Sequence, residues 1–133
     1  MDKIMEIHHI GYLVKRLEKS KKEFEKLGFK VISGDTHDTI RRIDICFIEK
    51  DGYVIELVAP YDDESVVAGM LKKYKNMPYH ICYCTNDLHQ EAENLAANGF
   101  VIIGEACPAP ALGGKRVEFL MNTKLGMVEL LEK

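Results

Sequence analysis

An internal repeat constrains the fold of this chain more than any other feature of its sequence. Residues 7–32 and residues 78–103 align without a gap when the first stretch is shifted by 71 positions. The identical residues include His9 and His80, together with apolar residues on either side of a predicted helix. A match of this length, with the same order of apolar and glycine positions, predicts a duplicated structural unit.

Each copy predicts the same order of elements. An apolar strand comes first, at residues 7–14 and 78–84, and an amphipathic helix follows it. Each helix ends near a glycine, Gly28 or Gly99, because glycine readily takes the left-handed conformation that closes a helix. A short strand follows each glycine, and two more complete each copy, at 41–48 and 53–59 in the first and at 115–121 and 126–131 in the second. Each half is therefore predicted to be a βαβββ module.

The predicted fold class is α+β, with tandem βαβββ modules that form a curved mixed sheet around a cavity and helices outside. The chain of 133 residues is long enough for one domain with a sizeable core, so we expect a single domain over 1–133. Its first module spans 7–59, and the second module spans 78–133. Between them, within 60–77, a linker helix is expected from about Glu64 to Tyr74. Residues 104–114, which contain two prolines and three glycines, predict a loop.

Charge and composition exclude several classes of partner. The net charge is −3 and no long basic run occurs, so we expect no nucleic-acid or membrane partner. No apolar stretch approaches the ~20 residues that a membrane-spanning helix needs. The N-terminal stretch lacks the features of a signal peptide, and the four cysteines form no C-x-x-C pair. These features predict reduced cysteines and a cytoplasmic location.

Four polar residues occupy equivalent places in the two modules. His9 lies in the first strand of its module and Glu56 in the last, and His80 and Glu129 take the same places in the second module. If the modules pack edge to edge, these four side chains can converge on one concave surface. Two imidazoles and two carboxylates suit one divalent metal ion, such as nickel, cobalt or zinc, with manganese or iron also suitable. Burying two carboxylates together without a cation would be costly, which also favours a metal.

The sequence resembles the vicinal oxygen chelate superfamily, which includes glyoxalase I, methylmalonyl-CoA epimerase, extradiol dioxygenases and bleomycin-resistance proteins. The resemblance runs from HHIGYLV to VELLEK and places the family's metal ligands at His9, Glu56, His80 and Glu129. It implies an enzyme that moves a proton next to a metal-bound carbonyl through an enediolate. In that chemistry Glu129 or Glu56 doubles as ligand and base.

Two branches of the superfamily compete as the predicted function. The stretches ELVAPYDDESVVAGMLKK and PALGGKRVEFL resemble methylmalonyl-CoA epimerases, which act on an acyl-CoA thioester. Epimerases usually carry a further carboxylate near the third strand, where this chain offers His37 or Asp38, and a longer turn before the last strand. The sequence therefore favours a glyoxalase I-like lyase acting on the hemithioacetal of methylglyoxal and a thiol. An antibiotic-binding protein of the resistance type is the third alternative.

Further residues are candidates for substrate contact, namely Arg42, Arg116, Lys115 and His37. His8 aligns with Tyr79 rather than with a ligand, and strand alternation places it on the face opposite His9, so we expect it to be structural. A homodimer is expected from the resemblance. The metal, the catalytic glutamate, and whether one chain or two complete the site all stay open.

Overall fold

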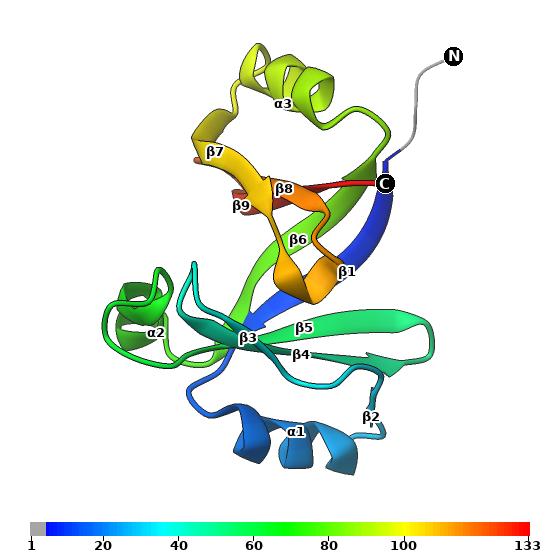
Figure 1. The fold of residues 1–133 in the computed structure, drawn as a ribbon, viewed down its shortest axis with the longest axis vertical. Coiled ribbons are helices and arrows are strands. Elements are labelled where there is room, and N and C mark those ends of the chain that lie inside the picture. The colour runs from blue at the N-terminus through cyan, green and yellow to red at the C-terminus, as the bar shows by residue number, and fades with distance from the viewer. Residues whose placement is uncertain (1–4) are drawn as a thin grey trace. The chain divides into compact units, whose positions relative to one another are not determined.

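The computed structural model describes residues 5–133 (Figure 1). The elements in chain order are β1 (Glu6–Leu13), α1 (Leu17–Lys26), β2 (Lys30–Val31), β3 (Thr36–Asp38), β4 (Ile43–Lys50), β5 (Tyr53–Pro60), α2 (Ala68–Tyr74), β6 (Met77–Thr85), α3 (Leu88–Ala96), β7 (Val101–Pro108), the short 3-10 helix η1 (Pro110–Leu112), β8 (Arg116–Asn122) and β9 (Gly126–Glu132). This order confirms the α+β class and the repeated strand–helix–strands pattern.

The chain divides into two compact units whose boundaries fall inside β1 and β6. One unit joins the chain up to His9 with His80–Lys133, and the other is Ile10–Tyr79. The boundaries therefore do not coincide with the ends of the repeat, because the first residues of β1 belong with the second half of the chain.

The unit Ile10–Tyr79 contains a mixed sheet in the strand order β2-β4-β5-β1, with β3 also paired to β4. Strand β1 runs parallel to β5, and in this register Gly11 lies opposite Glu56. Strands β4 and β5 form an antiparallel hairpin. Its turn contains Asp51 and Gly52, both with positive φ, as the tight turns of hairpins require.

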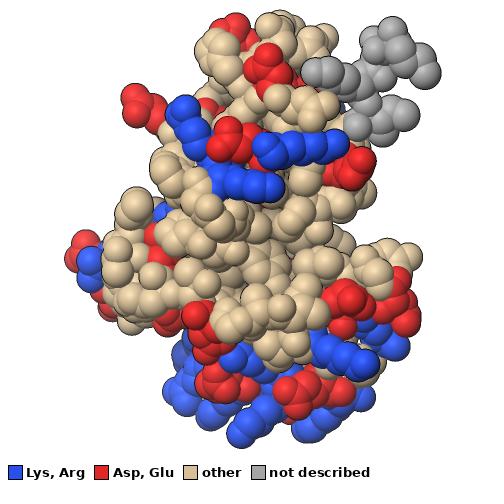
Figure 2. Space-filling model, turned by 45° about the vertical axis from the view of Figure 1, so that its right-hand side comes forward, with Lys and Arg blue, Asp and Glu red and all other residues tan. Residues whose placement is uncertain are grey.

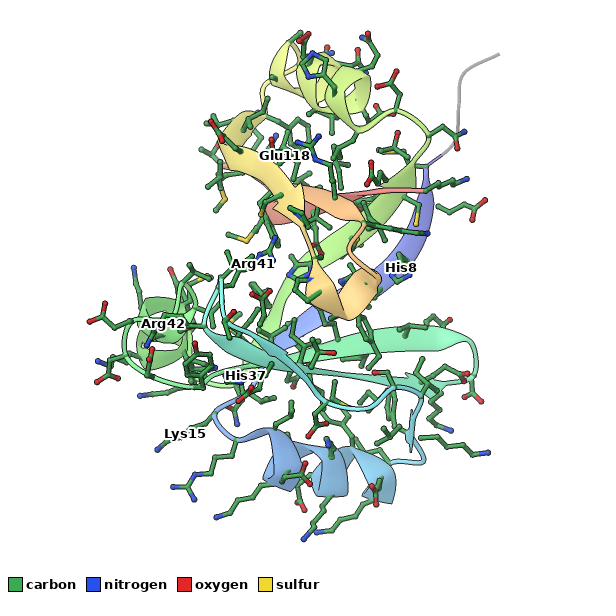
Figure 3. The ribbon with its side chains drawn as sticks, viewed as in Figure 1. His8, Lys15, His37, Arg41, Arg42 and Glu118 are labelled. Carbon is green, nitrogen blue, oxygen red and sulfur yellow. The ribbon has the colours of Figure 1, made fainter. Side chains whose placement is uncertain are left out.

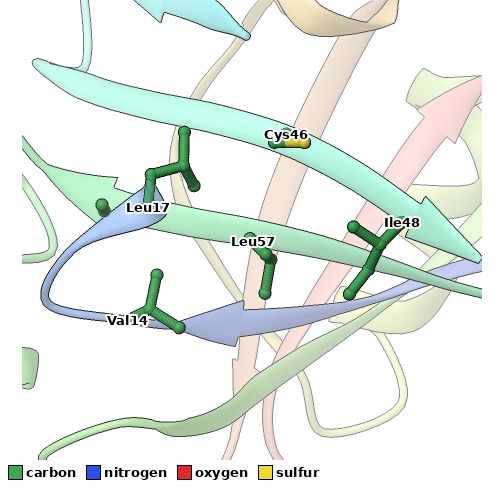
Figure 4. Close-up of a cluster of buried hydrophobic side chains, with 6 residues drawn as sticks. Val14, Leu17, Cys46, Ile48 and Leu57 are labelled. Carbon is green, nitrogen blue, oxygen red and sulfur yellow. The ribbon is translucent and has the colours of Figure 1, made fainter. Parts of the chain in front are cut away.

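Helix α1 covers one face of this sheet (Figure 1), and the side chains of the core that it closes are drawn in Figure 4. The core cluster consists of Val14, Leu17, Cys46, Ile48, Leu57 and Ala59. Phe24 packs against the same cluster, seven residues after Leu17, and two helical turns place both side chains on one face of α1. The ring of Phe24 also meets Tyr12 edge-on at a centroid distance of 5.2 Å. Burial of this face is what holds the helix on the sheet.

The unit that contains His80–Lys133 has its own mixed sheet, in the strand order β6-β9-β8-β7. Strand β6 runs parallel to β9, and β8 pairs antiparallel with both β7 and β9. Helix α3 begins at its N-cap Asp87, whose side chain accepts a hydrogen bond of 3.0 Å from the backbone N–H of Gln90. A second core beneath this helix contains Leu88, Ala92, Leu120 and Leu130.

Three local expectations differ from the structure. Strand β3 was not expected from the sequence, and strand β7 continues as far as Pro108, into the segment 104–114 that predicted a loop. The later part of that segment forms η1 and a turn. The linker helix begins at Ala68, later than the sequence pattern indicates.

The surface carries acidic and basic side chains intermixed, and Figure 2 shows both kinds side by side on the face in view. None of the helices in the described part of the chain is long and apolar enough to cross a membrane. No disulfide bond joins the four cysteines, all of which lie in the part of the chain that the structure describes.

Candidate metal centre

Three of the four predicted metal ligands converge within one unit of the chain. The Nε2 atoms of His9 and His80 lie 3.2 Å apart. The Oε1 atom of Glu129 lies 3.2 Å from His9 Nε2 and 2.9 Å from His80 Nε2. All three side chains are buried. Residues distant in sequence therefore present three lone-pair donors to one point.

The parallel pairing of β6 and β9 explains how His80 and Glu129 come to share a face. Cys82 lies opposite Glu129 in this register, and His80 is two residues before Cys82 on the same side of β6. On the other flank of β9, Phe119 of β8 lies opposite Glu129. The ring of Phe119 meets the ring of His80 edge-on at a centroid distance of 5.4 Å. An aromatic ring thus lines the site beside its polar atoms.

The spacing of the three donor atoms fits a metal ion. Metal bonds of the usual length to imidazole nitrogen and carboxylate oxygen place two ligand atoms about 3.0 Å apart at a right angle and about 3.4 Å apart at a tetrahedral angle. Two of the three separations, both 3.2 Å, fall within that range, and the third, 2.9 Å, lies just below its lower end. The two imidazoles also face each other through ring nitrogens, an arrangement in which at most one of them can donate to the other. A cation between them satisfies both.

The electrostatics of the cluster keep its carboxylate ionised. Burial by itself raises the pKa of Glu129, because a charge is costly away from water. Hydrogen bonds from His80 and His9 oppose this and hold the pKa of Glu129 below its usual range. Glu129 is therefore a carboxylate at neutral pH, which is the form that binds a divalent cation.

Glu56, the fourth predicted ligand, is a buried residue of β5 in the other unit. It lies opposite Gly11 of β1 on one side and opposite Phe47 of β4 on the other. Its role as a ligand stays a prediction from the sequence.

His8 differs from what strand alternation predicts. Its Nδ1 atom lies 2.8 Å from Nδ1 of His9, and the two rings meet edge-on at a centroid distance of 5.1 Å. Neighbouring residues of a strand start toward opposite faces, but an imidazole is long enough to bend back toward its neighbour. His8 therefore contacts a predicted ligand. Sequence reasoning missed this contact, although the doubled histidine was its visible signal.

The residues predicted to contact substrate from the first module are held by carboxylates of their own unit (Figure 3). Arg42 donates to both carboxylate oxygens of Asp62, which lowers the pKa of Asp62. His37 lies 2.5 Å from Asp44 through Nδ1, and its ring stacks on Tyr61 at a centroid distance of 4.3 Å. Substrate contact by Arg42 and His37 stays a prediction.

In the second module, the guanidinium of Arg116 donates to the backbone carbonyl of Ala106 at 3.3 Å. Arg116 and Lys115 are both exposed, and their contact with substrate also stays a prediction. Asp38, the alternative acid suggested by the sequence, is buried and accepts hydrogen bonds from the backbone and guanidinium of Arg41. These contacts give Asp38 a role in fixing the turn that follows β3.

The family model described as Glyoxalase/Bleomycin resistance protein/Dioxygenase superfamily matches residues 8–119. The chain belongs to this superfamily. The match confirms the resemblance inferred from the repeat and covers His9, Glu56 and His80, whereas Glu129 lies beyond its end.

Similar members of the superfamily carry epimerase names. The mitochondrial methylmalonyl-CoA epimerase of Dictyostelium discoideum is 27% identical over 135 residues, covering 98% of this chain and 80% of the relative. An ethylmalonyl-CoA/methylmalonyl-CoA epimerase of Cereibacter sphaeroides is 25% identical over 115 residues, covering 86% of each. The fold matches a methylmalonyl-CoA epimerase of Streptomyces coelicolor in complex with 2-nitronate-propionyl-CoA, with a TM-score of 0.83 and 21% identity over 98% of this chain and 99% of that one.

Proposed function

We propose that this member of the superfamily is a metal-dependent acyl-CoA epimerase that inverts the carbon next to the thioester carbonyl of a 2-methylmalonyl-type substrate. The observation that supports the metal is the convergence of His9, His80 and Glu129 at separations of 2.9 to 3.2 Å. The observation that supports the substrate is that both sequence relatives are epimerases of malonyl-CoA derivatives. The relatives favour this branch over the glyoxalase I branch that the sequence alone favoured.

Strand β1 supports Glu56 as the fourth ligand. His9 and Gly11 lie on the same face of β1, because side chains two residues apart point the same way. Gly11 lies directly opposite Glu56 in the parallel pairing of β1 with β5. We propose Glu56 as the fourth ligand because the repeat gives it the place in the first module that Glu129 has in the second.

The four residues divide the chemistry among them. A bound divalent metal would act as a Lewis acid on the thioester carbonyl and lower the pKa of the adjacent C–H bond. His9 and His80 would hold the metal as neutral imidazoles. An epimerase must remove a proton from one face of the carbon and return it to the other, which needs two proton carriers. The chain offers two buried carboxylates for this, Glu129 and Glu56.

Deuterium exchange tests the epimerase directly. The protein loaded with nickel, cobalt, zinc or manganese is incubated with methylmalonyl-CoA in D₂O, and label at the carbon next to the thioester is followed by mass spectrometry. We expect exchange in the wild type and a loss of about 100-fold or more in Glu129→Gln, the scale of removing a general base. His89→Ala is the matched control for His80→Ala, since the His89 side chain is 86% exposed. Exchange that persists in His80→Ala and Glu129→Gln would contradict the proposal.

Glyoxalase I-like activity is the second candidate function. The observation that favours it is that Asp38, the acid that the sequence offers near the third strand, is buried and held by Arg41. The carboxylate within strand β3 (Thr36–Asp38) is that of Asp38. This carboxylate already accepts a hydrogen bond from the guanidinium of Arg41. The test is thioester formation from methylglyoxal and glutathione with the same metals. Turnover in this assay alone would replace the epimerase with a lyase. Tight antibiotic binding with turnover in neither assay would indicate a resistance-type binding protein.

The expected homodimer and cytoplasmic location remain proposals. The finding that bears on assembly is that His9, His80 and Glu129 meet within a single chain. A second copy is therefore not needed to bring these three together. Light scattering during size-exclusion chromatography measures the number of chains, with and without added metal.

A further inference from the structure

We propose that His8 is a positioning residue of the metal centre, which accepts a hydrogen bond from His9 and fixes the ring that binds the metal. The inference rests on the proposed function only in taking His9 as a ligand. It requires neither the acyl-CoA substrate nor the epimerase reaction.

Both ends of the His9 imidazole are engaged. Nε2 lies 3.2 Å from Nε2 of His80 and 3.2 Å from Oε1 of Glu129. At the opposite end of the ring, Nδ1 lies 2.8 Å from Nδ1 of His8. The edge-on geometry, with an interplanar angle of 82°, directs ring nitrogens toward each other rather than stacking the ring faces. His8 therefore contacts the end of the ligand that points away from the cluster.

The chemistry of imidazole then fixes the protons. A neutral imidazole carries one N–H, and its other nitrogen has the lone pair that binds a metal. When Nε2 of His9 gives its lone pair to a metal ion, the hydrogen of the neutral ring must sit on Nδ1. The contact of 2.8 Å to His8 then makes His9 the donor, and Nδ1 of His8 the acceptor. His8 consequently carries its own hydrogen on Nε2.

This hydrogen bond has two effects on the ligand. It selects the tautomer with a free lone pair on Nε2, and it holds the ring in the orientation that faces His80. A hydrogen-bond acceptor behind a ligating histidine also raises the basicity of the ligand, and loss of such a partner typically weakens metal binding 10- to 100-fold.

The repeat makes this partner specific to one of the two histidines. Tyr79 stands before His80 where His8 stands before His9. A tyrosine has no ring nitrogen, so the second module cannot reproduce this contact in the same form. We infer that His9 and His80 are unequal ligands, and that His9 depends on the residue before it.

Metal affinity of the full-length protein tests the proposal. Binding of Co²⁺ and Zn²⁺ is measured by competition with a chromophoric chelator for wild type, His8→Phe and His8→Asn. Phenylalanine keeps a ring but removes the acceptor, and we expect the Kd to rise 10- to 100-fold. Asparagine offers an oxygen near the position of the imidazole Nδ1, so we expect it to restore most of the affinity. His89→Ala is the control for the loss of a histidine, since that side chain is exposed.

Two further measurements separate positioning from a structural role. Thermal unfolding of the metal-free variants shows whether each one folds. Nitrogen NMR of the zinc-loaded protein should show His9 with a hydrogen-bonded N–H at Nδ1 in the wild type, and the shift of that Nδ1 should move toward that of a ring without an acceptor in His8→Phe. Equal metal affinity in folded His8→Phe and wild type would overturn the proposal, as would an equal loss in His8→Asn and His8→Phe. If the wild type binds metal through His9 but shows no epimerase activity, the proposed function fails and this inference stands.

Discussion

Replacing Glu118 with glutamine should stabilise the protein, and increasingly so as the pH rises. Glu118 lies on β8 opposite Leu130, on the face of the strand that also carries Leu120 beneath α3 (Figure 3). Its side chain is 93% buried, and its Oε2 atom has no hydrogen-bond partner. Burial raises the pKa of Glu118, because an ionised carboxylate loses its hydration among these leucines.

The sign of the pH dependence follows from this direction. The folded protein holds the proton of Glu118 more tightly than the unfolded chain does, so folding takes up a proton above the usual glutamate pKa of about 4.3. The contribution of Glu118 to stability is therefore fully present below that pH and is lost as the pH rises through the folded-state pKa. Glutamine does not titrate and avoids the loss.

The magnitude comes from the unsatisfied oxygen. A buried polar atom without a partner costs about 1–3 kcal/mol, and more when it is charged. Glutamine removes the charge but not the need for a partner, so we expect a gain of about 1 kcal/mol at pH 7. For a domain of this size that gain corresponds to a rise in Tm of about 4 °C.

Thermal unfolding followed by circular dichroism at pH 4 and at pH 7 measures the effect. Glu118→Gln and the wild type should have nearly equal Tm values at pH 4 and separate at pH 7. Glu25→Gln, the same change at an exposed position of α1, is the control and should show no such separation. A Glu118→Gln variant that is less stable than wild type at pH 7, or a difference independent of pH, would refute the reasoning.

Three further predictions concern stability. Leu57 is fully buried in the core beneath α1, so Leu57→Ala should lower the free energy of unfolding by about 2–5 kcal/mol. Urea titration measures this change, and a loss below about 1 kcal/mol would mean that the core collapses around the cavity. Asp87 caps α3 through the N–H of Gln90, so Asp87→Ala should cost about 1 kcal/mol in the same assay, whereas Asp87→Asn should cost much less. Gly99 has a φ of +97°, and a Cβ added there would meet no other atom within 4 Å. Gly99→Ala should therefore lower the free energy of unfolding by about 1–2 kcal/mol through backbone strain alone, and an unchanged unfolding midpoint would argue against that conformation.

The convergence of His9, His80 and Glu129 could be predicted from the sequence because it depends on the repeat and on the alternation of side chains along a strand. Alternation along a strand places His80 and Cys82 on one face, and parallel pairing then brings Glu129 alongside. The repeat supplied the equivalence of His9 and His80, which no single motif would have given. Elements of secondary structure were predicted wherever apolar periodicity was strong.

The features that the sequence did not reveal depend on side-chain torsions and polar turns. Alternation gives the direction in which His8 leaves the backbone, but the torsion angles of its side chain decide that its ring turns back to His9. The linker helix starts late because Asp62 accepts the N–H of Glu64, and Ser65 accepts the N–H of Val67. These contacts hold the residues before Ala68 in turns.

The spacing of the repeat has a consequence for the mechanics of folding. A metal bound by both His9 and His80 ties together two points of the chain that lie 71 residues apart. In the chain-entropy treatment used for disulfides, a cross-link that closes a loop of this length lowers the conformational entropy of the unfolded chain. This loss raises the free energy of the unfolded chain by about 4 kcal/mol when the cross-link is also present in the unfolded chain. A bound ion would favour the folded form because the unfolded chain offers no preformed ligand set. The ion that would activate the substrate would therefore also join the beginning of the chain to its second half, and its availability would govern how long the molecule stays folded.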